Sequence, residues 1–321
     1  MLFCQLAHTD LHVSRACMGT MTFGSQAALA EAQRMVDLCF DSEVNFFDTG
    51  NVYNQGLSEQ ILGKVLGARR KDIILASKVR GRMTTPSEYG GVSREAIKKA
   101  IGDSLTRLGT DYLDIYYLHH PDYETPVEET LETMDQLRRE GKIRYIGLSN
   151  FSAWQICEIH WICEKNGWQK PVIAQPMYNL VARGIEQEYL PFTRRFGVSN
   201  VCYNPLAGGL LTGKQSKEQG PLANTRFDKN AMYLSRYWHD QYFESVEELK
   251  AIARKAGLTP VQLAIGWLLQ QNGADCVILG ASRAEQTQGE SPGSRNACPR
   301  CSSPRGVRSD VEEVARANSH L

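Results

Sequence analysis

The sequence predicts an α/β protein, a (β/α)8 TIM barrel with an N-terminal β-hairpin. Two observations support this fold class: eight short, mostly apolar runs occur along the chain, and segments with helical spacing of apolar residues separate them. Parallel strands that are buried on both faces read as continuous apolar runs, and strict alternation with helices indicates a parallel sheet. Eight such units in 321 residues fit one closed barrel.

The strands are expected to be short and to follow a hairpin. Polar and apolar residues alternate over 3–15 around Thr9 and Asp10, which is typical of two short paired strands. The barrel strands are expected at Ala16–Thr20, Asn45–Asp48, Ile73–Lys78, Tyr112–Leu118, Tyr145–Ser149, Val172–Gln175, Asn200–Tyr203 and Cys276–Leu279.

Helices are expected between these strands, the weakest of them at Gly184–Phe196. The others are expected at Ala27–Phe40, Ser58–Leu66, Ser93–Leu108, Val127–Arg139, Ala153–Lys165, Ser245–Lys255 and Pro260–Gln271. Ser58 and Ser93 are expected to cap the helices that they begin, and Gly141 and Gly167 to end the helices that precede them.

A doubly wound open sheet is the alternative fold. That fold usually carries G-x-G-x-x-G after its first strand, and Gly19–Gly24 lacks this spacing. The barrel is therefore expected over residues 1–286. Residues 287–321 form an atypical C-terminal tail, because Ser, Pro, Arg and Gly dominate it and such a composition is typical of disorder; only Asp310–Ala317 fits a helix.

Charge, cysteine content and hydropathy limit the possible partners. Basic and acidic residues balance at 36 each, so no net field would recruit nucleic acid or an anionic membrane. The nine cysteines are scattered, mostly in apolar runs, as reduced buried thiols are. No run approaches the ~20 apolar residues of a membrane span, and no signal peptide is recognised. We expect a cytoplasmic protein with a small-molecule partner; the oligomeric state stays open.

Four polar residues of different types are expected at one rim of the barrel. Asp48, Lys78 and His119 stand at the ends of the second, third and fourth strands, and Tyr53 lies in the loop after the second. Active sites of this fold lie where strands end and βα loops begin. Lys78 would lower the pKa of the Tyr53 phenol, Asp48 would keep Lys78 charged, and His119 would orient a carbonyl oxygen. The set suits proton transfer and oxyanion stabilisation without a nucleophile.

Taken singly, each of these residues also fits a structural role. Asp48 could cap a turn, Tyr53 and Lys78 could be surface side chains, and His119 could be a core histidine. The His119–His120 pair could suggest a metal, but no further cluster has ligand spacing, so no metal is expected. The occurrence of all four residues at one rim favours the catalytic interpretation.

Several ordered motifs resemble the aldo-keto reductases. They run from the N-terminal hairpin to about Gln286, and they are Asn45–Gly50 with Tyr53, Ala76–Lys78, Leu118–Asp122, Gly141–Asn150 and Tyr203–Lys214. The resemblance implies a barrel that binds NADP(H) across its carboxyl-end rim and passes hydride to a carbonyl carbon. It implies that Tyr53 is the general acid/base, that Asp48 and Lys78 tune it, and that His119 orients the carbonyl.

The resemblance also implies cofactor contacts along the whole rim. Ser149, Asn150 and Gln175 would bind the carboxamide, Tyr203 would stack on the nicotinamide, and Gly19, Thr20, Met21 and Asp48 would line the first loops. The remaining implied cofactor residues are Asn204, Pro205, Leu206, Gly208, Leu210, Gly213, Lys214, Arg226, Gly280, Ser282 and Gln286.

The segment Gly208–Lys214 admits a second interpretation, because it fits G-x4-G-K after a strand. A phosphate loop of the Walker type needs Ser or Thr next, and Gln215 follows here. Glycine-rich backbone with a lysine suits a pyrophosphate equally well. The resemblance to the aldo-keto reductases implies that this segment wraps the pyrophosphate of the cofactor.

The chain departs from the family pattern after Gln286. The family continues there with a residue pair that opens the last helix and grips the adenosine, whereas Gly289, Pro292 and Gly293 would break a helix. Our hypothesis is a diverged ending, with weak NADPH affinity and low stability.

Three functions are considered. The first is an NADP-dependent aldo-keto reductase, an oxidoreductase acting on CH–OH groups that reduces aldehydes or ketones. The second is a cofactor-binding accessory subunit similar to potassium-channel β subunits. The third is a tail-damaged barrel with little activity.

Overall fold

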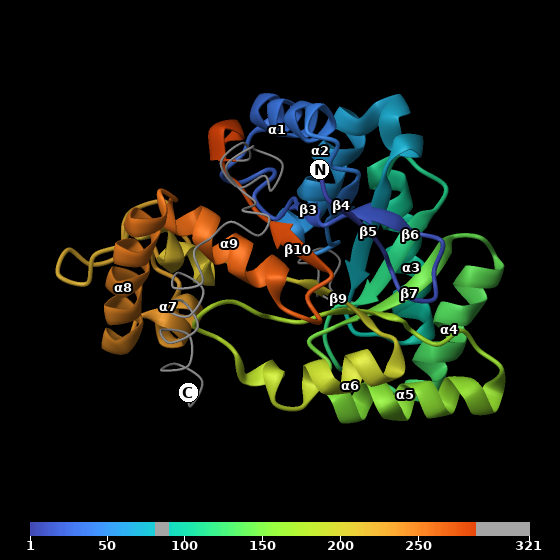
Figure 1. Cartoon of the computed structure of the whole chain (residues 1–321). Coiled ribbons are helices and arrows are strands. Elements are labelled where there is room, and N and C mark those ends of the chain that lie inside the picture. Colours follow the sequence, from blue (N-terminus) through green and yellow to red (C-terminus); the bar gives the residue numbers. More distant parts are fainter. Residues whose placement is uncertain (81–89, 287–321) are drawn as a thin grey trace.

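Eight parallel strands close on themselves in the computed structural model of the chain, which describes residues 1–80 and 90–286 (Figure 1). In sheet order they are β10 (Cys276–Leu279), β3 (Ala16–Gly19), β4 (Phe46–Asp48), β5 (Ile74–Val79), β6 (Leu113–Leu118), β7 (Ile143–Ser149), β8 (Ile173–Gln175) and β9 (Ser199–Cys202). The last strand pairs with the first, with Val277 opposite Ala16 and Leu279 opposite Met18. This closure confirms the predicted (β/α)8 barrel.

Helices follow the strands and cover the outside of the barrel (Figure 1). They are α1 (Leu29–Asp41), α2 (Leu57–Leu66), α3 (Arg94–Leu108), α4 (Val127–Arg139), α5 (Ala153–Asn166), α6 (Tyr189–Phe196), α7 (Ala231–Tyr237), α8 (Asp240–Ala256) and α9 (Pro260–Gln270). Short 3-10 turns add η1 (Tyr53–Gly56), η2 (Gly67–Asp72), η3 (Gly184–Glu186) and η4 (Ala207–Thr212).

Local sequence signals account for most of the helix ends. Ser93 accepts a bond from the backbone N–H of Ala96 and caps α3, as predicted. Gly141 and Gly167 take left-handed φ values of 73° and 67° just after α4 and α5, where a side chain would cost energy.

Three expectations about the helices were wrong in detail. Ser58 caps no helix: α2 begins one residue earlier, with Gly56 as its N-cap and no side-chain cap. The weak region at 184–196 splits into η3 and α6. No helix was expected between the strand at Asn200–Tyr203 and the helix at Ser245–Lys255, but α7 lies there, because Asn230 caps a new turn by accepting from Tyr233 N–H. Together α7 and α8 form a lobe at one side, on the left in Figure 1.

Apolar side chains fill the inside of the barrel and the layer between strands and helices. The interior cluster includes Phe46, Ile115, Tyr117, Ile173 and Val201, all fully buried. Tyr117 packs directly on the backbone of Gly147 in the next strand, where an added Cβ would lie 2.3 Å from its ring. The absence of a side chain at 147 therefore makes room for a large ring in the barrel.

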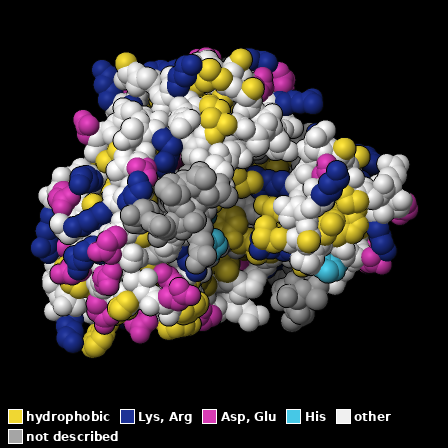
Figure 2. All heavy atoms as spheres, turned by 180° about the vertical axis from the view of Figure 1, so that it is seen from behind, with side chains coloured by type: hydrophobic (Ala, Val, Ile, Leu, Met, Phe, Trp, Pro, Cys, Tyr) yellow, Lys and Arg dark blue, Asp and Glu magenta, His cyan; other side chains and the backbone are white. Residues whose placement is uncertain are grey.

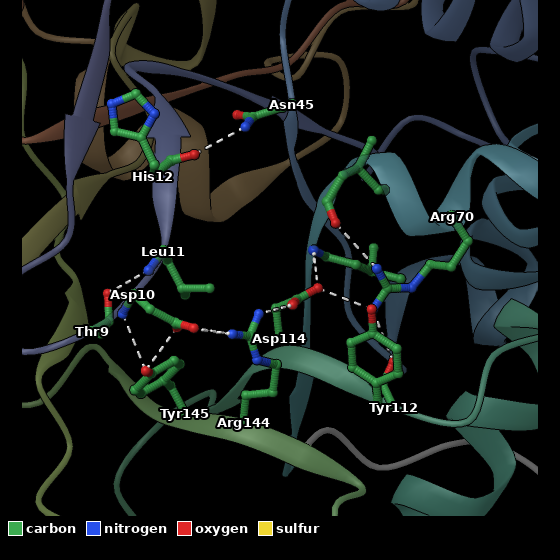
Figure 3. A network of polar contacts seen from close by, with 12 residues as sticks. Thr9, Asp10, Leu11, His12, Asn45, Arg70, Tyr112, Asp114, Arg144 and Tyr145 are labelled. Carbon is green, nitrogen blue, oxygen red and sulfur yellow. Dashed lines mark hydrogen bonds and ion pairs between the residues drawn. The ribbon is translucent and has the colours of Figure 1, made fainter.

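The N-terminal hairpin, β1 (Phe3–Gln5) and β2 (His12–Ser14), closes the amino-terminal end of the barrel. Buried Leu6, Leu11 and Val13 join the interior cluster. At the hairpin turn, Asp10 accepts bonds from Arg144 and from the Tyr145 hydroxyl at the start of β7 (Figure 3).

Arg144 extends this polar network into the barrel wall. Its Nη1 donates to Asp114 Oδ1 over 2.8 Å, and Arg70 donates to the other oxygen of Asp114 over 3.0 Å (Figure 3). The network therefore ties the hairpin to β7, β6 and the turn before β5.

Two further observations concern membrane-spanning helices and the expected C-terminal tail. No helix among the described residues is long and apolar enough to cross a membrane. The expected tail, 287–321, lies outside the described residues, as does the last helix expected there.

Candidate active site

Strand register places the four predicted catalytic residues at the carboxyl-end rim. Asp48 is the last residue of β4 and lies opposite Gly19 and Ala76 of the neighbouring strands. Lys78 of β5 lies opposite Tyr117 of β6. His119 follows Tyr117 by two positions, just after the end of β6. Tyr53 opens η1, in the loop directly after β4.

Lys78 is the hub of contacts at this rim. Its ammonium is fully buried and donates to Asp48 Oδ1, to the Thr49 carbonyl over 2.6 Å and to the Tyr53 hydroxyl over 3.2 Å. All three donors of the ammonium are therefore satisfied, and one of them is aimed at the phenol.

The Lys78–Asp48 pair keeps the lysine charged. Burial is the largest single effect and by itself would lower the pKa of Lys78, but the Asp48 carboxylate and the Tyr53 phenol together raise the pKa above its usual value. Burial also raises the pKa of Asp48, against the Lys78 ammonium and the Gln175 amide, which favour the carboxylate. The predicted role of Asp48 as the counter-ion of Lys78 agrees with this geometry.

Tyr53 differs from the sequence expectation in one respect. Lys78 acts on the phenol in the expected direction, but enclosure of the hydroxyl is the larger effect, and the pKa of Tyr53 is raised. At neutral pH the phenol is therefore a protonated donor. A protonated phenol next to an ammonium can release its proton, because Lys78 stabilises the phenolate that remains.

His119 stands beside Tyr53 as a neutral imidazole. The two rings lie 5.9 Å apart between centroids and nearly perpendicular, at 83°. Burial and the nearby Lys78 charge lower the pKa of His119 to about 2. A neutral imidazole keeps one ring N–H to donate to a carbonyl oxygen.

Three buried hydroxyls link the loops that follow β3 and β4 to the start of α2, and sequence reasoning missed them as a group. The Ser58 hydroxyl donates to the Thr20 carbonyl over 2.7 Å and lies 2.9 Å from Thr20 Oγ1 and 3.2 Å from Thr49 Oγ1. All three residues are fully buried. The only signal in the sequence was their polarity next to apolar strand ends.

The residues assigned to the carboxamide form a connected set, with one unexpected contact. Gln175 Nε2 donates to Asp48 Oδ2 over 2.9 Å, so its amide supports the ion pair. Ser149 donates to the Gln175 carbonyl, and Asn150 Nδ2 donates to the His119 carbonyl over 2.9 Å. Tyr203 donates to Asn150 Oδ1 over 2.7 Å. Asn150 thus connects the carboxyl ends of β6, β7 and β9.

The loop after β9 begins with a strained turn. Asn204 has φ of 61°, its Oδ1 accepts from Gly208 N–H over 2.7 Å, and its Nδ2 donates to the Tyr237 hydroxyl. Pro205, Leu206, Leu210 and Gly213 complete this segment, with Leu210 buried and Lys214 exposed at its end. Gly208 and Gly209 take φ values of 70° and 103°, which glycine adopts without a Cβ penalty.

Cationic and small residues meet at the far side of the rim. Arg226 donates to the Tyr233 hydroxyl over 3.1 Å, and its other terminal nitrogen lies 3.2 Å from where a Cβ on Gly280 would stand. Ser282 donates to Gln286 from both its N–H and its hydroxyl. The Arg226 guanidinium lies against the backbone of Gly280, which carries no side chain, and near glycine turns. This arrangement can bind phosphate oxygens.

The first loop supplies the remaining predicted residues. Gly19 packs so closely on Ile278 that a Cβ would lie 2.6 Å from it, Thr20 is buried under Ser58, and Met21 is 38% exposed.

Figure 2 shows a hollow between the barrel and the lobe of α7 and α8, with hydrophobic, basic and His side chains at its edge.

Metal ligation finds no support in the part of the chain that the structure describes. His119 and His120 stack at 4.7 Å between centroids. Among residues 1–80 and 90–286, no group of three or more His, Cys, Asp or Glu side chains is arranged to hold a metal ion.

Comparison with known proteins identifies the family. A family model described as "Aldo/keto reductase family" matches residues 15–290. The chain belongs to the aldo/keto reductase family. This confirms the resemblance drawn from the motifs.

Relatives within this aldo/keto reductase family carry two kinds of name. "Probable voltage-gated potassium channel subunit beta" of Oryza sativa subsp. japonica is 36% identical over 293 residues, covering 89% of each chain. "Aflatoxin B1 aldehyde reductase member 2" of Rattus norvegicus is 35% identical over 288 residues, 84% of this chain and 77% of the relative. "Uncharacterized oxidoreductase YrpG" of Bacillus subtilis (strain 168) is 35% identical over 297 residues, 89% of each.

Membership of the aldo/keto reductases makes this protein an oxidoreductase that reduces carbonyl compounds. The relatives named as channel subunits belong to the same kind of barrel, so their similarity does not favour an accessory role over reduction.

Proposed function

We propose that this protein is an NADPH-dependent reductase of aldehydes or ketones, with Tyr53 as the general acid. The observation that carries the proposal is the contact of Lys78 with Tyr53 over 3.2 Å while Asp48 and the Thr49 carbonyl hold the same ammonium. A proton donor whose conjugate base meets a fixed positive charge fits reduction of a carbonyl.

The residues divide the work of proton delivery. The His119 ring N–H donates to the carbonyl oxygen and fixes its position, while the Tyr53 hydroxyl gives its proton to that oxygen as negative charge develops. Lys78 stabilises the phenolate, and Asp48 keeps Lys78 charged in a site where burial favours the neutral amine. A nicotinamide cofactor bound at this rim would supply the hydride.

The cofactor assignment rests on the shape and charge of the rim. Gly280 leaves room for the Arg226 guanidinium against the end of β10, and Gly208 and Gly209 give the loop after β9 its close turns. Tyr203, fixed by its bond to Asn150, offers a ring at the end of β9. We assign Arg226 and Lys214 to the phosphates and Tyr203 to the nicotinamide, and we place the protein in the cytoplasm.

The test is oxidation of NADPH by the full chain with a panel of aldehydes and ketones, comparing wild type with Tyr53→Phe. We expect Tyr53→Phe to lose about 10²–10⁴-fold in turnover, the usual size of a general acid's contribution, while fluorescence titration shows unchanged NADPH binding. Tyr112→Phe is the matched control, because Tyr112 precedes β6 at the opposite end of the barrel and keeps its ring against Arg70.

Three outcomes would decide against the proposal. Ordinary turnover by Tyr53→Phe would remove Tyr53 from the mechanism. NADPH binding without turnover of any carbonyl by the wild type would favour a cofactor-binding accessory subunit, and failure to bind NADPH would favour a barrel with little activity.

A further inference from the structure

Two cysteines meet where the N-terminal hairpin joins the barrel, at the end opposite the site described above. Cys4 lies in the middle of β1, and Cys276 is the first residue of β10. Their sulfur atoms are 3.6 Å apart although 272 positions separate them in sequence. A disulfide requires about 2.05 Å between sulfurs, so a shift of roughly 1.5 Å would join them.

The two thiols differ in access. Cys276 is fully buried, with 0% of its surface exposed, whereas Cys4 is half-buried. Among the described residues, β1 pairs with β2 and with no barrel strand, so Cys4 is held outside the barrel's hydrogen-bonded ladder. Of the two, Cys4 can meet a dissolved reagent and can also make the small shift.

The surroundings of Cys4 favour its thiolate. Arg15 lies beside the pair, because its guanidinium donates to the carbonyls of Asp275, Leu269 and Ala274. The hydrogen bond between Cys4 and Cys276, with help from Arg15, lowers the pKa of Cys4 against burial and the Asp275 carboxylate.

The buried thiols in the described part of the chain behave differently. Burial raises the pKa of Cys39 and of Cys163 to about 12, and it raises the pKa of Cys276 as well. Since the thiolate is the reactive form of cysteine, these buried thiols are poor nucleophiles toward a dissolved peroxide. Cys276 needs only to reach an oxidised Cys4, whose sulfur lies 3.6 Å away.

We propose that Cys4 and Cys276 are a hydroperoxide-sensitive pair that forms a reversible disulfide between the hairpin and β10. The Cys4 thiolate attacks the terminal oxygen of the hydroperoxide and the O–O bond breaks. Cys4 becomes a sulfenic acid as alkoxide (hydroxide, from hydrogen peroxide) leaves and is protonated. The Cys276 thiol then attacks the Cys4 sulfur and gives its proton to the departing hydroxyl, so that the S–S bond forms, the S–O bond breaks and water leaves. Two thiols and one hydroperoxide give one disulfide, one water and the corresponding alcohol or, from hydrogen peroxide, a second water.

The bond would act on the stability of the barrel closure. The hairpin covers the interior cluster through Leu6, Leu11 and Val13, and β10 is the strand that pairs with β3 to close the barrel. A covalent link between them restricts the unfolded chain over a very long loop, the case in which a disulfide is expected to stabilise most in the entropic account. Oxidation is therefore expected to raise the thermal midpoint.

The test treats the full chain with hydrogen peroxide, alkylates the remaining thiols and maps the digest without reduction by mass spectrometry. We expect a linked peptide pair containing Cys4 and Cys276, its loss after dithiothreitol, and a rise of the thermal midpoint that is absent in Cys4→Ser. Cys157→Ser is the matched control, because Cys157 is an exposed cysteine on α5 outside the pair, and it should keep both effects.

Three results would overturn the proposal. They are irreversible oxidation of Cys4 without a link, a link from Cys4 to any other cysteine (Cys298 and Cys301 of the tail included), and an unmodified Cys4 at peroxide doses that oxidise Cys157. The mapping uses the wild-type chain, so it decides the matter even where Cys4→Ser does not fold.

Discussion

Gln175 Nε2 donates a hydrogen bond to Asp48 Oδ2 over 2.9 Å, across the barrel from β8 to β4. The other carboxylate oxygen of Asp48 accepts from Lys78, so both oxygens of this buried carboxylate are engaged. A side chain expected at the cofactor therefore also supports the ion pair that polarises Tyr53. Its substitution should affect stability as well as ligand binding.

Gln175→Met is expected to destabilise the fold by about 1–3 kcal/mol, the cost of leaving a buried acceptor without its donor. Urea unfolding followed by fluorescence measures this loss. The matched control is Gln33→Met, which removes the same kind of amide–carboxylate bond, from Gln33 to Asp37, on the partly exposed surface of α1. Equal losses of unfolding free energy in the two variants would show that the burial of Asp48 does not increase the cost of removing its hydrogen-bond donor.

Lys78→Met should be more damaging, because it leaves the Asp48 carboxylate buried without its cation. Breaking a buried pair from one side typically costs about 3–5 kcal/mol. The double variant Asp48→Asn/Lys78→Met removes both charges and should recover part of that loss. Urea unfolding of the two variants checks this, and a double variant that is less stable than Lys78→Met would contradict the pairing.

The steady-state rate of carbonyl reduction should not change with pH near neutrality. Burial raises the pKa of Tyr53 above its usual value near 10, so the proton donor persists through neutral pH and is lost only as the pH rises through that raised pKa. His119, with its pKa lowered to about 2, stays neutral throughout. Steady-state rates between pH 5 and about 9 should be flat, and a limb near pH 6.5 would indicate a titrating histidine.

Gly147→Ala is expected to destabilise the barrel by about 1–3 kcal/mol, because the new methyl group would lie 2.3 Å from the Tyr117 ring in a full interior. Gly102→Ala is the control: Gly102 lies inside α3 with nothing within 4 Å of its added Cβ. That change should be neutral or stabilising by about 0.5–1 kcal/mol, since alanine favours a helix interior over glycine. Thermal and urea unfolding distinguish the two.

Arg226→Met should weaken NADPH binding and make it less dependent on salt, because the guanidinium at Gly280 is assigned to the phosphates. Fluorescence titration at two ionic strengths measures both effects. Lys217→Met is the control, since Lys217 pairs with Asp240 on the surface. An unchanged dissociation constant in Arg226→Met would separate this arginine from the cofactor.

Much of the fold followed from local patterns. Each strand is a short apolar run, and caps such as Ser93 and end glycines such as Gly141 act within a few residues of their own position. The prediction that Ser58 caps a helix was wrong because the partner of Ser58 is distant in the sequence. The Ser58 hydroxyl bonds to Thr20, 38 positions away, and no local rule could select that partner over the nearby helix N-terminus.

The sequence by itself determined that Asp48, Tyr53, Lys78 and His119 stand at or just after strand ends, because parallel alternation sends every strand end to one rim. It did not determine how the side chains pair there. Only the closed barrel brought Gln175 onto Asp48, connected Tyr203 through Asn150 to His119, and placed Cys4 beside Cys276.

The direction of the Tyr53 pKa was likewise decided by the tertiary structure. Sequence reasoning supplied the Lys78 charge but not the degree of enclosure, and enclosure is the larger effect. The physical reason is that charge types can be read from a sequence, whereas burial and pairing depend on strand register and closure between residues that lie far apart in the chain.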